Sequence, residues 1–519
     1  MELRLVLETV PLAAELPSAL ASTDIRGIAY DSRKAGSGFL FFAFPGAKTD
    51  GARFAEAAVK AGAVAVVSDR PRPGGFAAPW IQVLHGREAL AVAARNFYGK
   101  PDERIAVTAV TGTNGKTTST LLIDAILRAV GKTTALVGTI EYHLAGRVLP
   151  APNTTPESLD LLRLFHELEE AGGTHATIEA SSHALDLRRI YALNVHTAGF
   201  TNFTRDHLDY HGTMEAYFEA KQLLFTPAVG PPPHFAVLNA DDEGARKLRI
   251  SPESRIIWYS IDRQAPAGLP EEQLWLRATD VESGFDGLRF SVSGVVDAPR
   301  IESKLVGRIN VYNILLSYGV GLTYGLSSEQ IQKGLRELVS VPGRFERVEE
   351  GQPFMVVVDY AHTDDALRNV IAIARAMKPK RVITLFGCGG DRDRSKRPLM
   401  GMAASELSDY VVLTSDNPRS EDPLAIINDA LVGLRRYDTP HTVEPDRERA
   451  IQMALKGAAP GDVVILAGKG HETYQILRDG PIPFDDREVA RRVLRSLGYS
   501  GARPDKKAHA GSSLTQGNG

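Results

Sequence analysis

Lys116 and the hydroxyl residues beside it have the most specific chemistry in the chain. They stand in Gly112-Thr-Asn-Gly-Lys-Thr-Thr118, between an apolar, β-rich run at 104–111 and a helical pattern that ends at Gly131. This order is typical of a phosphate-binding loop, where backbone N–H groups and a helix N-terminus face an anion. Lys116 can then reach the outer phosphates, and the Thr117 hydroxyl can hold Mg²⁺. Val110 stands where the general pattern has glycine, so the alternative is a structural turn that happens to contain Gly-Lys-Thr.

A carboxylate and a set of hydroxyls follow the next buried segments. Glu179 ends a predicted strand at 175–179, and 153–155 is a loop of small hydrogen-bonding side chains. Because the carboxyl ends of parallel strands line the ligand crevice, Glu179 is expected to face the phosphate-binding loop and bind Mg²⁺. Taken alone, such an acid is more often a helix cap or a surface residue.

Two His and two Asp lie within residues 206–211, which suggests a further site. The spacing is not the i, i+4 pair of a helical zinc site, so we predict Mg²⁺ chemistry with one His as helper. Lys221 follows on a predicted helix at 217–225. A lone lysine on such a helix is usually exposed to solvent.

Ser32 and Arg33 are weaker candidates near the start of the chain. Both can hydrogen-bond an anionic ligand. The spacing alone favours a turn with a solvated arginine over a binding site.

The elements that must position these residues indicate an α/β protein with several domains. We predict a small N-terminal α/β domain at 1–102, a central domain with a mostly parallel sheet at 103–341, a C-terminal domain with a Rossmann-like open sheet at 342–502, and a disordered tail at 503–519. Residues 251–306 are expected to form an antiparallel flank of the central sheet. In the third domain, four buried runs each end in polar residues, which predicts a binding edge. These polar ends are Asp359, Asp391-Arg392, Asp416-Asn417-Pro418-Arg419 and Gly468 to Glu472.

Composition limits the class of protein. The chain has 519 residues, 43% of them hydrophobic and 24% charged, with a net charge of −3. Near-neutral charge argues against nucleic acid as a partner. The single Cys388 and the lack of a secretory signal or of a long apolar stretch predict a cytoplasmic protein without membrane insertion.

Several motifs together resemble the Mur ligase family, the ATP-dependent amino-acid ligases of peptidoglycan synthesis. The phosphate loop at 111–118 matches that family's own form, which accounts for Val110. The other motifs are Asp31-Ser-Arg33, Asn153-Thr-Thr-Pro156, Ser181-Ser-His183, Arg205 to Gly212, Gly343-Arg-Phe345, Asp359 to Thr363, Gly389 to Asp393 and Asp416 to Arg419.

The resemblance implies a role for each matching residue. The catalytic residues would be Lys116, Lys221 and His207, with Lys221 carbamylated so that it becomes an anion. ATP would contact Gly112, Thr113, Asn114, Gly115, Lys116, Thr117, Thr118, Asn310, Arg344 and Asp359. Mg²⁺ would be held by Thr117, Glu179, His207 and Lys221. A UDP-N-acetylmuramoyl dipeptide would bind Ser32, Asn153, Thr154, Thr155, Ser181 and Arg189. The incoming amino acid would bind Arg392, Asp416, Asn417, Pro418, Arg419, Gly468 and Glu472.

The Asp-Asn-Pro-Arg form of the last pocket is associated in this family with meso-diaminopimelate. A guanidinium such as Arg419 can bind its extra carboxylate with two hydrogen bonds, and Glu472 can accept from its ammonium group. The expected reaction activates the D-glutamate carboxylate as an acyl phosphate, which the amine then attacks. We expect a monomer. The alternatives are a ligase of the same fold for L-lysine or for folylpolyglutamate synthesis, and a P-loop ATPase switch that forms no amide.

Overall fold

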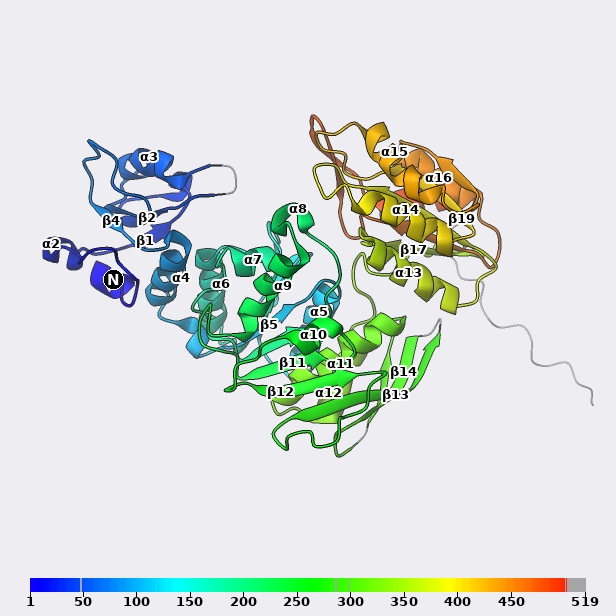
Figure 1. Cartoon of the computed structure of the whole chain (residues 1–519), viewed down its shortest axis with the longest axis horizontal. Helices are drawn as coiled ribbons and strands as arrows, with labels where there is room; N and C mark the ends of the chain where they lie inside the picture. The colour runs from blue at the N-terminus through cyan, green and yellow to red at the C-terminus, as the bar shows by residue number, and fades with distance from the viewer. Residues whose placement is uncertain (47–48, 285–286, 298, 500, 502–519) are drawn as a thin grey trace, which may run out of the picture. The chain divides into compact units, whose positions relative to one another are not determined.

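The computed structural model describes residues 1–46, 49–284, 287–297, 299–499 and 501, drawn in colour in Figure 1. The chain divides into two compact units, Met1–Val341 and the part from Pro342 onward. The first unit holds two sheets and the second holds a third, each packed with helices, which confirms the predicted α/β fold class. The predicted tail at 503–519 lies outside the described residues.

The N-terminal sheet contains four parallel strands within the described residues. They are β1 (Gly27–Ala29), β2 (Phe39–Ala43), β3 (Ala65–Ser68) and β4 (Trp80–Gln82). The helices of this part are α1 (Leu3–Val6), α2 (Ser18–Ala21), α3 (Ala55–Lys60) and α4 (Gly86–Phe97).

In the described part of the chain, the central sheet has 11 strands in the order β15-β14-β13-β12-β11-β10-β5-β9-β6-β7-β8. Their bounds are β5 (Ala106–Thr111), β6 (Thr134–Val137), β7 (Glu141–Leu144), β8 (Arg147–Pro150), β9 (His175–Glu179), β10 (Thr197–Phe200), β11 (Phe235–Asn239), β12 (Arg255–Ser260), β13 (Leu274–Gly284), β14 (Gly287–Ser293) and β15 (Arg300–Ser303). The middle strands are parallel and both edges are antiparallel. The flank predicted at 251–306 is therefore wrong for β12, which pairs in parallel with both of its neighbours.

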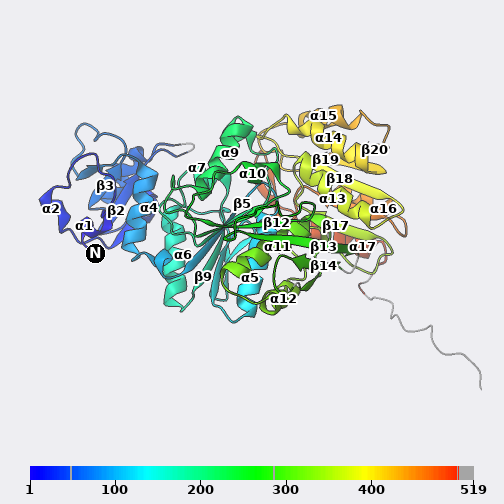
Figure 2. The same ribbon diagram turned by 60° about the horizontal axis from the view of Figure 1, so that its bottom comes forward.

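Helices cover both faces of the central sheet. Side chains on a strand alternate between the two faces, so the apolar residues of one strand pack against helices on either side. Val107 and Ala109 of β5 pack into one apolar cluster, whereas Val110 packs into another with α5 and α11. Figure 2 shows α5 and α11 beside the strands of this sheet. The helices of this part of the chain are α5 (Lys116–Ala129), α6 (Ser158–Glu170), α7 (Ser182–Asp186), α8 (Leu208–His211), α9 (Met214–Gln222), α10 (Glu243–Lys247), α11 (Arg308–Thr323) and α12 (Ser328–Glu337).

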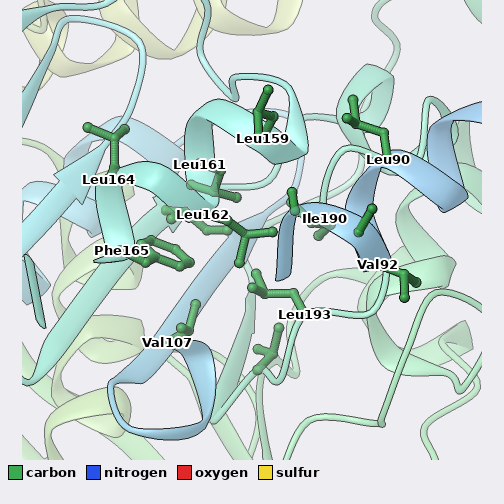
Figure 3. Packing of buried hydrophobic residues seen from close by; sticks show 14 of the residues in the cluster. Leu90, Val92, Val107, Leu159, Leu161, Leu162, Leu164, Phe165, Ile190 and Leu193 are labelled. Atoms are coloured by element: carbon green, nitrogen blue, oxygen red, sulfur yellow. The ribbon is translucent and has the colours of Figure 1, made fainter. Parts of the chain in front are cut away.

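One apolar cluster runs from the N-terminal sheet into the central one. Leu90 and Val92 of α4 belong to it together with Leu162 and Phe165 of α6 and Val107 of β5 (Figure 3). Burying one such side chain contributes roughly 1.5–3 kcal/mol. Polar contacts join the same elements, because Arg87 Nη1 donates to Glu157 Oε1 at 2.7 Å. These contacts join α4 to α6 and to its N-cap residue Glu157.

The second unit is built on a sheet with the order β16-β17-β21-β18-β19-β20 among its described residues. All neighbours are parallel except β16 and β17. The strands are β16 (Glu346–Arg347), β17 (Met355–Asp359), β18 (Val382–Cys388), β19 (Tyr410–Ser415), β20 (His441–Val443) and β21 (Val463–Ala467), with a hairpin of β22 (Tyr474–Leu477) and β23 (Gly480–Pro483). The helices are α13 (Asp364–Ala376), α14 (Lys396–Leu407), α15 (Pro423–Leu434), α16 (Arg447–Lys456) and α17 (Asp486–Ser496).

Among the described residues of both units, the structure contains no helix that is long and apolar enough to span a bilayer.

Candidate active site

The phosphate-binding loop connects β5, which lies between β10 and β9 in the parallel part of the central sheet, to α5, as predicted. Its two glycines allow a very close approach of neighbouring groups. A Cβ at Gly112 would lie 1.9 Å from Thr201 Oγ1, and one at Gly115 would lie 2.4 Å from Asn313 Oδ1. Both residues also have positive φ angles, 135° and 91°. Val110 is a buried core residue of β5, so the loop begins after it.

Hydrogen bonds hold this loop in place. Lys116 Nζ donates to the carbonyl oxygens of Gly112 and Thr113 at 3.0 and 2.8 Å. The Asn202 side chain, just beyond β10, accepts from Asn114 N at 2.9 Å and donates to Asn114 O at 3.0 Å. The strand next to β5 therefore sets the shape of the loop.

Glu179 faces the loop, at the carboxyl end of β9. Its carboxylate is buried and accepts from Thr117 Oγ1 at 3.1 Å, from Thr139 N at 2.8 Å and from Thr139 Oγ1 at 3.0 Å. A carboxylate and a hydroxyl in contact are the oxygen donors that suit Mg²⁺. These two side chains therefore fit the metal that the resemblance implies.

Lys221 is 1% exposed, so the prediction of a solvent-exposed lysine from the helix pattern is wrong. Its Nζ donates to Gly112 O at 2.7 Å and lies 4.5 Å from the centre of the Tyr217 ring. Burial, and then the positive charge of Lys116, lower the pKa of Lys221 well below its usual value, against the opposite effect of Asp206. The amine therefore loses its proton much more readily than an exposed lysine does.

His207 and His211 both lie beside His183, which follows the end of β9. The ring centres of His183 and His207 are 4.9 Å apart, and those of His183 and His211 are 5.5 Å apart. Burial, with a smaller contribution from His211, lowers the pKa of His183 to about 4. His211 Nε2 is 3.0 Å from Ser182 Oγ. In the part of the chain that the structure describes, no three His, Cys, Asp or Glu side chains form a group that could hold a metal ion.

Four of the predicted substrate residues meet beside Glu179. Thr155 Oγ1 donates to Glu179 O at 2.6 Å and accepts from Ser181 N at 3.2 Å. Arg189 Nη1 donates to Thr155 O at 2.8 Å, and the Thr154 and Thr139 hydroxyls are 3.2 Å apart. The loop at 153–155 thus lies against the end of β9.

The remaining two predicted substrate residues of this unit show weaker evidence of a site. Asn153 is exposed, and its carbonyl oxygen accepts from the Tyr142 hydroxyl. Ser32 lies in the short 3₁₀ turn Ser32–Lys34, which Asp31 caps. The neighbouring Arg33 side chain is 88% exposed and bonds Asp31 within the same turn, as expected of a solvated arginine.

The predicted nucleotide contacts outside the loop fall in both units. In the first unit, Asn310 Oδ1 accepts from Asn313 Nδ2 at 2.9 Å, and Asn313 packs against Gly115. In the second unit, Arg344 lies 4.5 Å over the Tyr360 ring. Asp359 accepts from Phe345 N and Ala361 N at 2.7 and 2.8 Å. Burial raises the pKa of Asp359, and the charge of Arg344 opposes this.

The residues predicted to bind the amino acid lie at the carboxyl edge of the second unit's sheet. Asn417 Nδ2 donates to Glu472 Oε2 at 2.9 Å, and Arg419 Nη1 donates to Gly390 O at 2.7 Å. Gly468 has a φ of 113°, and a Cβ there would be 3.1 Å from Asp416 Oδ2. Arg392 donates to Asp391 O at 3.1 Å from an exposed loop. Loops that follow three different strands therefore converge.

Lys469 contacts several of these residues, and the sequence reasoning did not single it out. It is completely buried, and its Nζ donates to Glu472 Oε2 at 2.9 Å and Asn417 Oδ1 at 3.0 Å. It also lies 3.6 Å from Asp416 Oδ1. The signal that was available is a lysine between two glycines directly after a buried strand.

Comparison with known proteins places the chain in a family. Family models match residues 24–98 (Mur ligase family, catalytic domain), 110–321 (Mur ligase middle domain) and 343–470 (Mur ligase, glutamate ligase domain). A curated relative from Solibacter usitatus (strain Ellin6076) is 61% identical over 96% of this chain and 99% of its own length. The chain belongs to the Mur ligase family. That relative is named UDP-N-acetylmuramoyl-L-alanyl-D-glutamate--2,6-diaminopimelate ligase.

Two further relatives of this Mur ligase carry the same name. One from Geobacillus kaustophilus (strain HTA426) is 44% identical over 92% of this chain and 96% of its own length. A solved structure described by that name is 32% identical, has a TM-score of 0.67, and covers 96% of this chain and 100% of its own. The similarity extends over all three sheets.

Proposed function

We propose that this Mur ligase adds meso-diaminopimelate to UDP-N-acetylmuramoyl-L-alanyl-D-glutamate in peptidoglycan precursor synthesis, with ATP converted to ADP and phosphate. The observation that carries the proposal is the 61% identity to a relative named for this reaction, along almost the whole of both chains. The pocket around Asn417, Arg419 and Glu472 supports the choice of amine. The buried free thiol of Cys388 fits a cytoplasmic enzyme.

The charges of this pocket suit an amino acid with two charged ends. Arg419 would bind the distal carboxylate of diaminopimelate, and Glu472 would accept from its distal ammonium group. Lysine has no distal carboxylate, so it would leave the guanidinium unpaired. This difference supports diaminopimelate over lysine.

The first chemical step brings the D-glutamate carboxylate to the γ-phosphate of ATP. The loop amides, Lys116 and the N-terminus of α5 would offset the negative charge that develops on the phosphoryl group. Thr117 and Glu179 would hold Mg²⁺, which when bound neutralises phosphate charge. A carboxylate oxygen bonds to the γ-phosphorus as the bond to ADP breaks, which gives an acyl phosphate. The diaminopimelate amine then attacks the acyl carbon and the C–N bond forms. The C–O bond to the phosphate breaks, inorganic phosphate leaves, and the nitrogen loses a proton.

Lys221 fits a further part of this proposal. A neutral amine can attack CO₂, and the lowered pKa of Lys221 increases its neutral fraction. The resulting carbamate would place an anion beside Gly112, on the loop that binds the phosphates. His207 would serve as a helper group of the metal site.

We assign the UDP part of the substrate to residues 1–102, ATP to 103–341 and the amino acid to 342–502. Ser32, Asn153, Thr154, Thr155, Ser181 and Arg189 would then hold the nucleotide peptide.

The deciding experiment measures phosphate release and amide formation by the purified protein with ATP, Mg²⁺ and the dipeptide precursor. We expect both to depend on added diaminopimelate and to be much slower with L-lysine. Faster turnover with lysine would refute the choice of amine. Phosphate release without any new amide would instead favour an ATPase switch.

A further inference from the structure

Arg447 and Asp486 form an ion pair that is completely buried in the second unit. Arg447 Nε donates to Asp486 Oδ1 at 2.8 Å, and Nη2 donates to Asp486 Oδ2 at 2.6 Å. Arg447 is the first residue of α16 and Asp486 the first residue of α17. None of the proposed substrate contacts uses either side chain.

The same guanidinium also reaches the ends of two strands. Arg447 Nη1 donates to Ser415 O at 3.2 Å, and Nη2 donates to Ala467 O at 2.9 Å. Ser415 is the last residue of β19 and Ala467 the last residue of β21. The next residues, Asp416 and Gly468, begin the two halves of the amino-acid pocket.

The sheet does not itself join these two strand ends, because β18 lies between them. Pairing of β18 with β19 continues to Cys388 and Ser415, but pairing of β18 with β21 ends at Leu385 and Leu466. Beyond that point, Ala467 pairs with Asp359 of β17 on the other side. Arg447 therefore connects the two pocket loops across a place where the strand ladder has ended.

We propose that Arg447, oriented by Asp486, is a positioning residue that sets the distance between the Asp416–Arg419 loop and the Gly468–Glu472 loop. The proposal rests on the function proposed above, in which these loops bind the amine. The planar guanidinium is held by Asp486 on one side and by the carbonyl oxygens of Ser415 and Ala467 on the other, so it has little freedom to move. It therefore fixes the separation of these two carbonyl oxygens. Binding of one ligand between two loops depends on that separation.

A purely structural role for the pair makes a different prediction. Replacing a buried ion pair by apolar residues of similar size is often neutral for stability, whereas removing one partner is costly. The double variant R447M/D486L therefore separates the two roles. It can restore the packing of α16 against α17, but it cannot donate to Ser415 O or Ala467 O.

The test compares R447K, R447M/D486L and the control R381K in the amide-forming assay. Arg381 pairs with Asp462 at the opposite, amino end of β18 and β21, at 2.6 Å. We expect R447K and the double variant to raise the KM for diaminopimelate about tenfold or more, with the KM for ATP changed less than about twofold. R381K should leave the KM for diaminopimelate unchanged.

Melting temperature and amide hydrogen exchange complete the comparison. A double variant that melts near the wild-type temperature but keeps the raised KM supports positioning. An unchanged KM for diaminopimelate in both Arg447 variants would overturn it. If the wild-type protein forms no amide, the proposed function fails, and exchange at 416–420 and 468–472 decides the inference separately. Faster exchange there in the double variant than in R381K supports it, and equal exchange contradicts it.

Discussion

Lys221 shows how the surroundings of a side chain can reverse what its position in a sequence pattern indicates. The helix pattern favours an exposed ammonium group, whereas α9 directs Lys221 onto the phosphate-binding loop, where it is buried. The cost of burying a charge lowers its pKa, and the nearby Lys116 lowers it further. Burial thus favours the neutral, reactive form of the amine.

Replacing Lys221 by alanine tests its role in catalysis. We expect kcat to fall at least about 100-fold, because one group that stabilises the transferring phosphoryl is lost. Added formate or acetate should restore part of the activity by supplying a carboxylate. The control is K247A, since Lys247 is exposed and pairs with Glu243 one helical turn away. Full activity of K221A would contradict the proposed role.

Replacing Lys469 by methionine tests the charge balance of the amino-acid pocket. The substitution leaves Glu472 and Asp416 without their buried cation. We expect the free energy of unfolding of the second unit to fall by about 3 kcal/mol, as found when one partner of a buried pair is removed. Chemical denaturation measures this, and a variant as stable as the wild type would show that Lys469 does not neutralise the pocket.

At the scale of elements, close packing of helices depends on glycines whose role the sequence does not reveal. Gly433 of α15 faces α14, and a Cβ there would lie 1.6 Å from Pro398 O. A side chain cannot be accommodated unless the two helices separate. Gly401 of α14 is as tightly placed, since its Cβ would be 2.1 Å from Ala430 O.

The variant G433A should therefore destabilise the second unit by about 1–3 kcal/mol, the usual cost of overpacking. Thermal unfolding measures the change. The control for the added methyl group is G74A in the first unit, because a Cβ at Gly74 meets nothing within 4 Å. Equal stability of G433A and G74A would mean that α14 and α15 can move apart at little cost.

At the scale of the whole molecule, a buried histidine in the first unit and a half-buried one in the second predict sensitivity to acid. Burial is the largest cause that lowers the pKa of His175 to about 4, and the charges of Lys132 and His196 act in the same direction. Burial also lowers the pKa of His471 to about 4, with Arg344 and Arg487 adding to it. As the pH falls below the usual value of 6.5, the unfolded chain takes up these protons before the folded chain does.

The free energy of unfolding should thus decrease as the pH falls from about 6.5 towards 4, and be highest above that range. In H175Q this decrease should be smaller, because one of the titrating groups is gone. Melting temperatures measured from pH 7 to pH 5 test this, with H441Q as control since His441 is exposed. An identical pH dependence in H175Q and wild type would contradict the assignment.

Much of the fold could be predicted because short-range patterns specify it. Buried β-rich runs became β5, β9, β18, β19 and β21, and polar residues placed at their ends lie at the carboxyl edges of the sheets. Strand direction was less predictable, as β12 shows, because pairing with β11 and β13 depends on segments distant in the sequence.

The sequence by itself determined the α/β class, the phosphate-binding loop and the residue types that can bind a nucleotide, a metal and a charged amino acid. These features depend on spacing and side-chain chemistry, which are determined by residues close together in the sequence. Only the tertiary structure decided that Lys221 and Lys469 are buried and that Arg447 joins the ends of β19 and β21. The burial of a side chain and the distance between two loops both follow from packing between segments far apart in the chain. Burial sets the pKa values of a site, and the distance sets its geometry.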